Sequence, residues 1–273
     1  MCDGDVLPKL DGVPGKRDVT TRRELSDASV NTADATEATV AGAPTLAPDL
    51  TSVAQDYLKV IWTAREWSQE EKVTTKLLAE RIGVSASTVS EAVRKLADQG
   101  LVEHARYGSI TLTEQGSRAA VAMVRRHRLL ETFLVNELGY GWDEVHDEAE
   151  VLEHAVSELL MARIDAKLGY PDRDPHGDPI PSVDGDVPTP PARQLSEFTA
   201  GQRGRVARIS DFDPDMLRYF DSVGIALDTV MEVLERRDFA GTIAVRIGAA
   251  DTPVDLGKPA AEAIWLTTGA GAV

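Results

Sequence analysis

Four side chains of the kinds that bind metal ions lie within one short stretch: His146, Glu150, Glu153 and His154. Their offsets of four, seven and eight residues place all of them on one face of an α-helix. Carboxylates this close repel each other unless a cation or another partner lies between them. An amphipathic helix with a charged outer stripe is the simpler alternative, but this combination of histidines and glutamates on one face favours a metal site.

A second histidine–carboxylate pair, His127 and Glu131, lies upstream of the first group. These residues are four apart in another stretch with helical spacing, so their side chains also share a helix face. The single cysteine, Cys2, lies in what reads as a tail, which excludes an intramolecular disulfide and a thiolate metal cage. The second pair therefore adds to the expectation of a metal centre with histidine and carboxylate ligands.

The length and composition fit a soluble protein of two or three domains, with 273 residues, 42% of them hydrophobic and 27% charged. No apolar run reaches the roughly 20 residues of a membrane helix, and the N-terminus lacks a signal peptide pattern, so we expect a cytoplasmic protein with no membrane partner. The net charge of −16 argues at first against nucleic acid. However, residues 50–125 carry ten Lys or Arg against nine Asp or Glu, so this segment is nearly neutral.

The segment that follows residue 72 has the pattern of a winged helix-turn-helix. A threonine-capped helix ends at Gly83, which supplies a sharp turn, and Ser85 caps a second helix over residues 86–99. Two helices joined by a short glycine-containing turn are typical of a helix-turn-helix. Two short strands, at residues 101–106 and 109–112, predict a β-hairpin wing. A helical protein-binding module is the alternative, which the wing disfavours.

Small hydroxyl side chains at the start of the second helix suit close approach to phosphates and base edges. Basic side chains further along the helix and in the wing suit phosphate contacts. The residues expected to face double-stranded DNA are Ser85, Ser87, Thr88, Ser90, Glu91, Arg94, Lys95 and Arg106.

These patterns divide the chain into five segments of an α+β multidomain protein. Residues 1–48 read as a disordered extension, and residues 49–122 as the winged helix-turn-helix domain. Residues 123–170 form helices whose wide apolar stripes suggest a dimer interface as well as a core. The Pro- and Gly-rich residues 171–195 are typical of a linker, and residues 196–273 of a small β-barrel.

From about residue 50 to its end, the chain resembles the diphtheria toxin repressor family of metal-dependent transcriptional regulators. The resemblance is carried by residues 84–90, 127–131, 145–154 and 177–181. It implies a winged helix-turn-helix, a helical dimerisation and metal-binding domain, and a C-terminal Src-homology-3-like β-barrel. It also implies a homodimer that binds palindromic operators and represses metal-uptake genes when metal is bound, with no enzymatic activity and no small-molecule substrate.

The resemblance implies a primary metal site made of Asp56, Glu150, Glu153 and His154. Without the resemblance, Asp56 would be interpreted as an acidic residue that interacts favourably with the helix dipole in the early turns of a helix. The iron-responsive branch of the family has Met and Cys where this chain has Asp56 and Glu150, whereas the manganese-responsive branch has Asp and Glu. Carboxylates in place of sulfur favour hard cations, so Mn(II) is the expected cofactor and Fe(II) the alternative.

The resemblance also implies an ancillary site, which matches at His127, Glu131 and His146. Our alignment places Asp213 and Met216 where the iron-responsive branch has two further ligands from its barrel. Asp213 is the expected ligand, because Met216 is a poor ligand for Mn²⁺ and fits a core position. Asp215 is a substitute that the alignment leaves open.

Asp56 belongs to the DNA-binding domain and the other primary donors to the helical domain, so metal is expected to fix one domain against the other. Without metal, the acidic cluster is expected to repel itself. Two alternatives remain at this stage, an iron(II)-dependent repressor of the same fold and a helical carboxylate metalloenzyme. The second is disfavoured because Val151 and Val124 stand three residues before His154 and His127, where di-iron bundles carry Glu.

Overall fold

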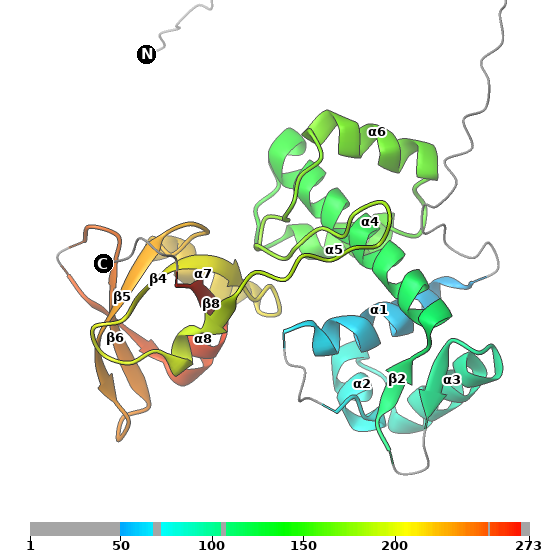
Figure 1. Ribbon diagram of the computed structural model, residues 1–273, viewed down its shortest axis with the longest axis horizontal. Helices are drawn as coiled ribbons and strands as arrows, with labels where there is room; N and C mark the ends of the chain where they lie inside the picture. The colour runs from blue at the N-terminus through cyan, green and yellow to red at the C-terminus, as the bar shows by residue number, and fades with distance from the viewer. Residues whose placement is uncertain (1–49, 68–71, 105–107, 251, 269–273) are drawn as a thin grey trace, which may run out of the picture. The chain divides into compact units, whose positions relative to one another are not determined.

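The computed structural model describes residues 50–67, 72–104, 108–250 and 252–268. Its first part contains α1 (Ser52–Glu66), α2 (Thr75–Ile82), α3 (Ala86–Asp98), β1 (Val102–His104) and β2 (Ile110–Leu112) (Figure 1). The two strands pair in antiparallel orientation, so the predicted winged helix-turn-helix is confirmed. Arg106, which was expected to contact DNA, and the predicted extension over residues 1–48 lie outside the described residues.

The local signals that predicted these helices act as expected. The hydroxyl of Thr74 accepts a hydrogen bond from the backbone N–H of Leu77 and begins α2. Gly83 ends the helix in the left-handed region with φ of 75°, which a residue with a side chain rarely adopts. Ser85 then caps α3 by accepting from the N–H of Thr88. These two caps and one glycine fix the angle at which α3 is presented.

The helical part of the chain consists of α4 (Glu114–Leu138), α5 (Val145–Leu152) and α6 (Glu158–Leu168). The first half of α4 buries Ala119 and Ala120 in the core of the DNA-binding part, against α1. Its second half buries Leu129 and Leu130 in a separate core formed with α5 and α6. A single continuous helix therefore contributes to both cores and connects them.

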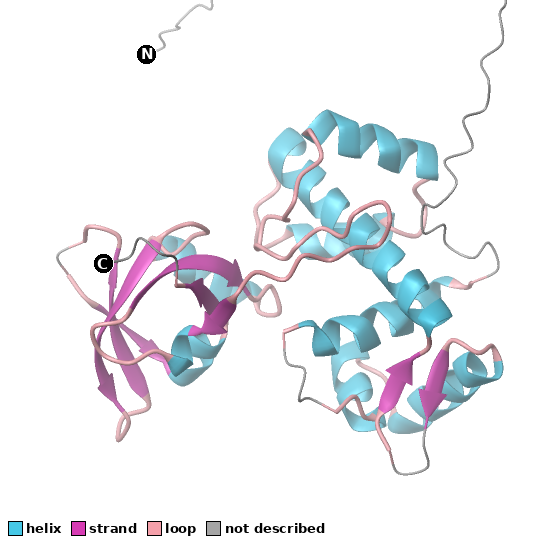
Figure 2. Cartoon of the chain, viewed as in Figure 1, coloured by secondary structure: helices cyan, strands magenta, loops and turns pink. Residues whose placement is uncertain are grey.

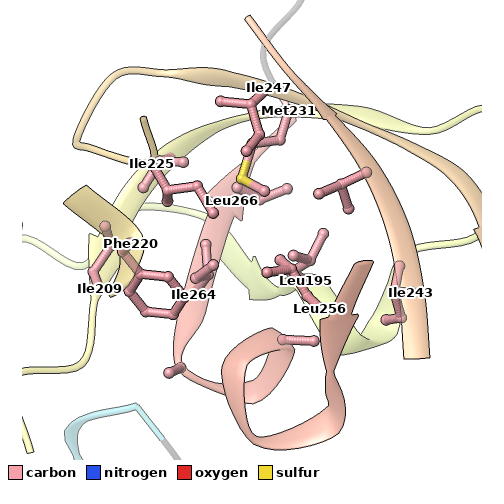
Figure 3. Close-up of a cluster of buried hydrophobic side chains, with 14 of the residues drawn as sticks. Leu195, Ile209, Phe220, Ile225, Met231, Ile243, Ile247, Leu256, Ile264 and Leu266 are labelled. Atoms are coloured by element: carbon pink, nitrogen blue, oxygen red, sulfur yellow. The ribbon is translucent and has the colours of Figure 1, made fainter. Parts of the chain in front are cut away.

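The C-terminal part contains an antiparallel sheet, whose strands are magenta in Figure 2. The strands lie in the order β3-β8-β4-β5-β6-β7. Its strands are β3 (Ala192–Gln194), β4 (Arg203–Ile209), β5 (Val230–Arg237), β6 (Thr242–Ile247), β7 (Val254–Gly257) and β8 (Ile264–Thr267). The sheet is joined by α7 (Pro214–Ser222), α8 (Lys258–Glu262) and a short 3-10 helix (Leu195–Glu197). Buried aliphatic side chains together with Phe198 and Phe220 form its core, part of which is drawn in Figure 3.

Three elements differ from the prediction. β3 lies inside the segment predicted as a linker, because its pairing with β8 is a contact between distant residues that local patterns do not reveal. The short α8 follows β7 directly and was not predicted. Most important for function, α5 ends at Leu152, so Glu153 and His154 lie in the turn after the helix. None of the helices in the described ranges is long and apolar enough to cross a membrane.

Candidate metal centre

The first cluster of donors joins Asp56 of α1 to Glu153 and His154, which follow α5. The Nε2 atom of His154 lies 2.9 Å from Oδ1 of Asp56 and 3.7 Å from Oε1 of Glu153. Its Nδ1 atom lies 2.9 Å from Oε1 of Gln55, so Nδ1–H donates to this amide and Nε2 faces the carboxylates. A histidine held in this way presents the nitrogen that a metal ion needs.

Asp56 has a buried carboxylate oxygen that a bound cation would stabilise. Its Oδ1 atom is buried and makes no hydrogen bond with any described residue. Burial raises the pKa of Asp56, against the opposing effect of His154 and Lys59. A buried carboxylate oxygen without a donor costs free energy, which a bound cation would remove. The residues present therefore fit a metal ion.

The second cluster joins His127 and Glu131 of α4 to His146 of α5 and to Asp211, in the segment between β4 and α7. Oε1 of Glu131 lies 3.0 Å from Nε2 of His127 and 3.3 Å from Nδ1 of His146. The same Nδ1 atom of His146 lies 3.3 Å from Oδ2 of Asp211. The prediction that His127, Glu131 and His146 meet is supported by these distances.

Electrostatics in the second cluster keep both histidines protonated when no metal is bound. Burial lowers the pKa of His127, but the neighbouring Glu131 carboxylate and hydrogen bonds to Glu131 and Glu153 raise it to about 9. Burial also lowers the pKa of His146, while Asp211 and Glu131 raise it to about 11. Burial raises the pKa of Asp211, but the hydrogen bond to His146 and the charges of His176, His146 and Arg208 together lower it well below its ordinary value. Metal binding here must release protons.

Glu150 does not join the first cluster as predicted, but lies with His127 and His146 of the second. Its Oε1 atom is 3.5 Å from Nε2 of His146 and 4.0 Å from Nδ1 of His127. Glu153 links the clusters more directly, since its Oε2 atom is 2.5 Å from Nδ1 of His127. The predicted single face of donors is wrong in this respect. Because α5 stops at Leu152, His154 turns towards α1 while His146 faces α4.

Lys59 was missed by the sequence analysis. Its Nζ atom lies 2.6 Å from Oε1 of Glu150 and 2.6 Å from Oε1 of Glu153. Burial lowers the pKa of Lys59, but the two carboxylates raise it further, so the side chain stays charged. The expectation that the acidic cluster repels itself without metal is therefore wrong for these two carboxylates. The signal was available, because Lys59 stands three residues after Asp56 and shares its helix face.

The structure does not bring Asp213 to the second cluster. Its side chain caps α7, with Oδ1 accepting hydrogen bonds from the backbone N–H groups of Asp215 and Met216. Asp211, two residues earlier, is the carboxylate beside His146. Met216 packs against the core of the sheet, as its chemistry suggested. Asp215 is exposed and pairs with Arg218, so it does not substitute for Asp213.

The residues expected to contact DNA lie on an open surface of α3. Those that the structure describes are all exposed: Ser85, Ser87, Thr88, Ser90, Glu91, Arg94 and Lys95. The hydroxyl of Ser85 lies 2.8 Å from the hydroxyls of both Ser87 and Thr88. Lys95 pairs with Glu91 at 2.9 Å, an exposed contact that phosphate groups could replace.

Three families match successive parts of the chain. The family described as "Iron dependent repressor, N-terminal DNA binding domain" matches residues 49–110. The family described as "Iron dependent repressor, metal binding and dimerisation domain" matches residues 113–182. The FeoA domain matches residues 193–268, which include the antiparallel sheet.

Known proteins of this kind are similar over long stretches. The iron-dependent repressor IdeR of Mycobacterium tuberculosis is 37% identical over 137 residues, which are 50% of this chain and 58% of IdeR. The diphtheria toxin repressor of Corynebacterium diphtheriae is 30% identical over 200 residues, 69% of this chain and 87% of that protein. A solved structure described as a manganese-dependent transcriptional repressor in complex with manganese is 72% identical, with a TM-score of 0.76, and covers 79% of this chain and 99% of its own. The chain belongs to the diphtheria toxin repressor family of metal-dependent transcriptional repressors.

Proposed function

We propose that the protein is a Mn(II)-dependent repressor that binds operator DNA when metal joins its DNA-binding and helical domains. The observation that carries this proposal is the meeting of Asp56 on α1 with Glu153 and His154 after α5. A metal ion bound by donors from both domains stabilises one arrangement of those domains. The orientation of α3 would then be set before the protein meets DNA.

The choice of Mn(II) rests on the donor set and on similar proteins. The residues of both clusters offer carboxylate oxygens and imidazole nitrogens, which suit hard and borderline cations. The 72% identical structure described as a manganese-dependent repressor supports the same choice. Fe(II) is the second candidate, because IdeR and the diphtheria toxin repressor are similar over much of the chain. The repressor relatives leave no support for the metalloenzyme alternative.

The chain's own residues prepare the primary site in a defined way. Gln55 orients the imidazole of His154, and Lys59 neutralises Glu150 and Glu153 while no metal ion is bound. A bound divalent cation would supply the positive charge that Asp56 lacks. Glu150 lies beside the histidines of the second cluster and shares Lys59 with Glu153 of the first, and we retain it with Asp56, Glu153 and His154 as a primary ligand.

The ancillary site consists in this proposal of His127, Glu131, His146 and Asp211, with Asp211 in the place predicted for Asp213. Asp211 comes from the C-terminal part of the chain, while the other donors come from α4 and α5. A cation at this site would stabilise the contact between the C-terminal part and the helices. This cation would therefore stabilise the arrangement of these two parts of the chain without contacting DNA.

We further propose that the active form is a homodimer on a palindromic operator upstream of metal-uptake genes, in the cytoplasm. Exposed apolar side chains on the helical part support a dimer: Val151, Leu159 and Leu160. A two-fold dimer presents two copies of α3. These match two half-sites whose separation is one helical turn of DNA, roughly 34 Å, or a whole multiple of that length. The exposed hydroxyls at the start of α3 support base and phosphate contacts there.

The test is a mobility shift with a palindromic operator and metal-free protein titrated separately with Mn²⁺, anaerobic Fe²⁺ and Zn²⁺. The wild type should shift at low Mn²⁺, whereas Asp56→Ala should need at least tenfold more. Asp213→Ala is the matched control and should behave as the wild type in its response to Mn²⁺. Full Mn²⁺-dependent binding by Asp56→Ala would overturn the bridging mechanism, and an equal response to Fe²⁺ would favour the iron alternative.

A further inference from the structure

The end of α1 is held by contacts that have no role in the proposed function. Trp67 follows α1 directly, and its Nε1–H donates to Oδ1 of Asp178 at 2.6 Å. Asp178 lies in the loop after α6 and is only 5% exposed. The indole ring of Trp67 also lies 5.8 Å from that of Trp265 in β8, with 50° between the planes. The last residue of α1 therefore contacts both the loop and the C-terminal sheet.

Arg208 of β4 joins these three side chains to one another. Its guanidinium carbon lies 4.3 Å from the ring centroid of Trp265 and 5.0 Å from that of Trp67. Its Nε–H donates to Oδ1 of Asp178 at 2.7 Å, so one carboxylate oxygen accepts from both Arg208 and Trp67. A cation attracts the face of an aromatic ring more strongly where water is excluded, and the Arg208 side chain is only 11% exposed.

A bulge in β4 turns Arg208 away from the core of the sheet. The register of β4 against β8 shifts between Val206 and Arg208, so Ala207 is an extra residue. In a regular strand Arg208 would face the same side as the buried Val206, two residues earlier. The extra residue reverses this alternation, which places Ile209 in the core and Arg208 opposite Trp265. The sheet thus presents a cation and an aromatic ring side by side.

The loop after α6 meets the sheet at this bulge. The backbone N–H of Ile209 donates to the backbone oxygen of His176 at 2.8 Å. Gly177 follows with φ of 92°, and a Cβ atom there would lie 2.0 Å from the backbone oxygen of Ala207. Glycine is the residue that permits so close an approach. This packing places Asp178, the next residue, against the bulge.

We propose that Trp67, Asp178, Arg208 and Trp265 form a clamp that positions α1 for metal binding. The four side chains come from the end of α1, the loop after α6 and two neighbouring strands. None of them belongs to a metal cluster of the described residues, so they act through α1 and not as ligands. The inference rests on the proposed function, in which metal joins α1 to the residues after α5.

The clamp and the primary site lie on the same helix. Asp56 stands eleven residues before Trp67, which is about 16 Å along the helix axis. At the end that carries Trp67, Glu66 also pairs with Arg128 of α4, and the clamp adds a contact with the sheet. Fixing one end of a stiff helix limits the directions of the other. Metal then has less disorder to remove, so its apparent affinity increases.

The first test compares Mn²⁺ titrations of operator binding by the full-length wild type and Trp67→Leu. The variant should need roughly tenfold more Mn²⁺ for half-maximal binding, because α1 is in place in a smaller fraction of the metal-free protein. Its operator affinity at saturating Mn²⁺ should equal that of the wild type, whereas a general loss of folding would lower both. Arg208→Met should show the same shift. Arg193→Met, which removes an exposed arginine 4.7 Å from the ring of Phe198 in the C-terminal part, is the matched control and should not.

Hydrogen–deuterium exchange of the metal-free proteins tests the clamp apart from metal and DNA. Backbone amides in the last two turns of α1 should exchange roughly tenfold faster in Trp67→Leu than in the wild type. Amides of α6 should exchange at equal rates in both proteins. Thermal melts check that each variant is folded, and Arg208→Met serves for both tests if Trp67→Leu does not fold.

Two results would overturn the clamp. One is equal exchange of α1 in the wild type and a folded variant. The other is a Mn²⁺ midpoint that stays the same or falls, and a lower midpoint would show that these contacts hold an arrangement that metal has to break. Failure of the proposed repressor function would instead appear as operator binding by the wild type that ignores metal, with the difference in exchange still present.

Discussion

At the scale of single residues, Lys59 determines the electrostatics of the metal-free protein, because it neutralises carboxylates that were expected to repel each other. Its ammonium group lies 2.6 Å from both Glu150 and Glu153, and the exposed fraction of Glu153 is 0%. The cluster is therefore held together by a cation of the protein itself. A divalent metal ion at the same carboxylates would approach this positive charge and be repelled by it.

We expect Lys59→Met to bind Mn²⁺ about tenfold more tightly than the wild type, because the repulsion between two cations is removed. The metal-free variant should melt at a lower temperature, since a buried carboxylate loses its partner. Isothermal titration calorimetry and thermal melts measure the two effects. Lys76→Met, which removes an exposed lysine that pairs with Glu80 at 3.7 Å, is the control. Weaker binding by Lys59→Met would show that Lys59 positions the ligands instead of competing with the metal.

The histidines of the second cluster predict how metal affinity depends on pH. With pKa values raised to about 9 for His127 and about 11 for His146, both are protonated at neutral pH in the metal-free protein. A raised pKa stabilises the metal-free fold below the ordinary histidine pKa of about 6.5, and this stabilisation is lost as pH rises through about 9. Metal must displace these protons, so affinity should rise with pH.

Between pH 7 and 8.5 the affinity of this site for Mn²⁺ should increase by about tenfold per pH unit for each proton released. Calorimetry in two buffers of different ionisation enthalpy counts the released protons directly. His127→Gln should release fewer protons on binding than the wild type. An affinity that does not change across this range would contradict the pKa shifts.

The extent to which the metal centre could be predicted differs from residue to residue. Helical spacing alone brought His127 to Glu131, because both lie on α4 and the helix is regular. The resemblance supplied Asp56, which spacing reads only as an acidic residue early in a helix. Asp211 could not be chosen over Asp213, since both lie in the segment before α7. Only the structure shows that Asp213 is used as a helix cap.

At the scale of elements, α3 is positioned by local signals that the sequence displays. The Ser85 cap and the left-handed Gly83 define where α3 begins, and Val89, Val93 and Leu96 bury one face. The opposite face is left for DNA. By contrast, the end of α5 at Leu152 was not predictable, because the sequence continues with residues compatible with a helix and nothing local stops it. The division of the donors into two clusters follows from this end.

Lys95→Ala on the exposed face of α3 should weaken operator binding for all DNA sequences to a similar degree. If Lys95 contacts one phosphate, the slope of log affinity against log salt should decrease by about 0.9. Fluorescence anisotropy at several salt concentrations, with saturating Mn²⁺, measures this slope. Lys258→Ala, an exposed lysine at the start of α8, should leave the slope as it is in the wild type. A change in base preference without a change in slope would instead assign Lys95 to base contacts.

At the scale of the whole molecule, α4 physically connects the metal-binding residues with the DNA-binding part. The helix contributes Ala119 and Ala120 to the core that contains α3, and it also carries His127 and Glu131. Arg128 of the same helix pairs with Glu66 of α1 at 2.5 Å. The helix therefore connects the metal clusters with the DNA-binding core in every protomer. What a single chain lacks is a second copy of α3, which a palindromic operator requires.

The apolar surface of α5 and α6 is where we expect that second chain to bind. Val151 and Leu159 have exposed fractions of 70% and 68%, which is unusual for large aliphatic side chains and typical of an interface. Leu159→Glu should place a charge in this interface and yield a monomer by light scattering. Mn²⁺ binding should persist, because the clusters lie within one chain.

Operator affinity of Leu159→Glu should fall at least tenfold, since each monomer would contact only one half-site. Phe239→Glu is the matched control, because Phe239 is equally apolar and 94% exposed but belongs to the turn between β5 and β6. That variant should remain a dimer with the operator affinity of the wild type. If Leu159→Glu stays dimeric while Phe239→Glu dissociates, the dimer forms through the C-terminal sheet. The orientation of the two α3 helices would then depend on the metal-linked contact at Asp211.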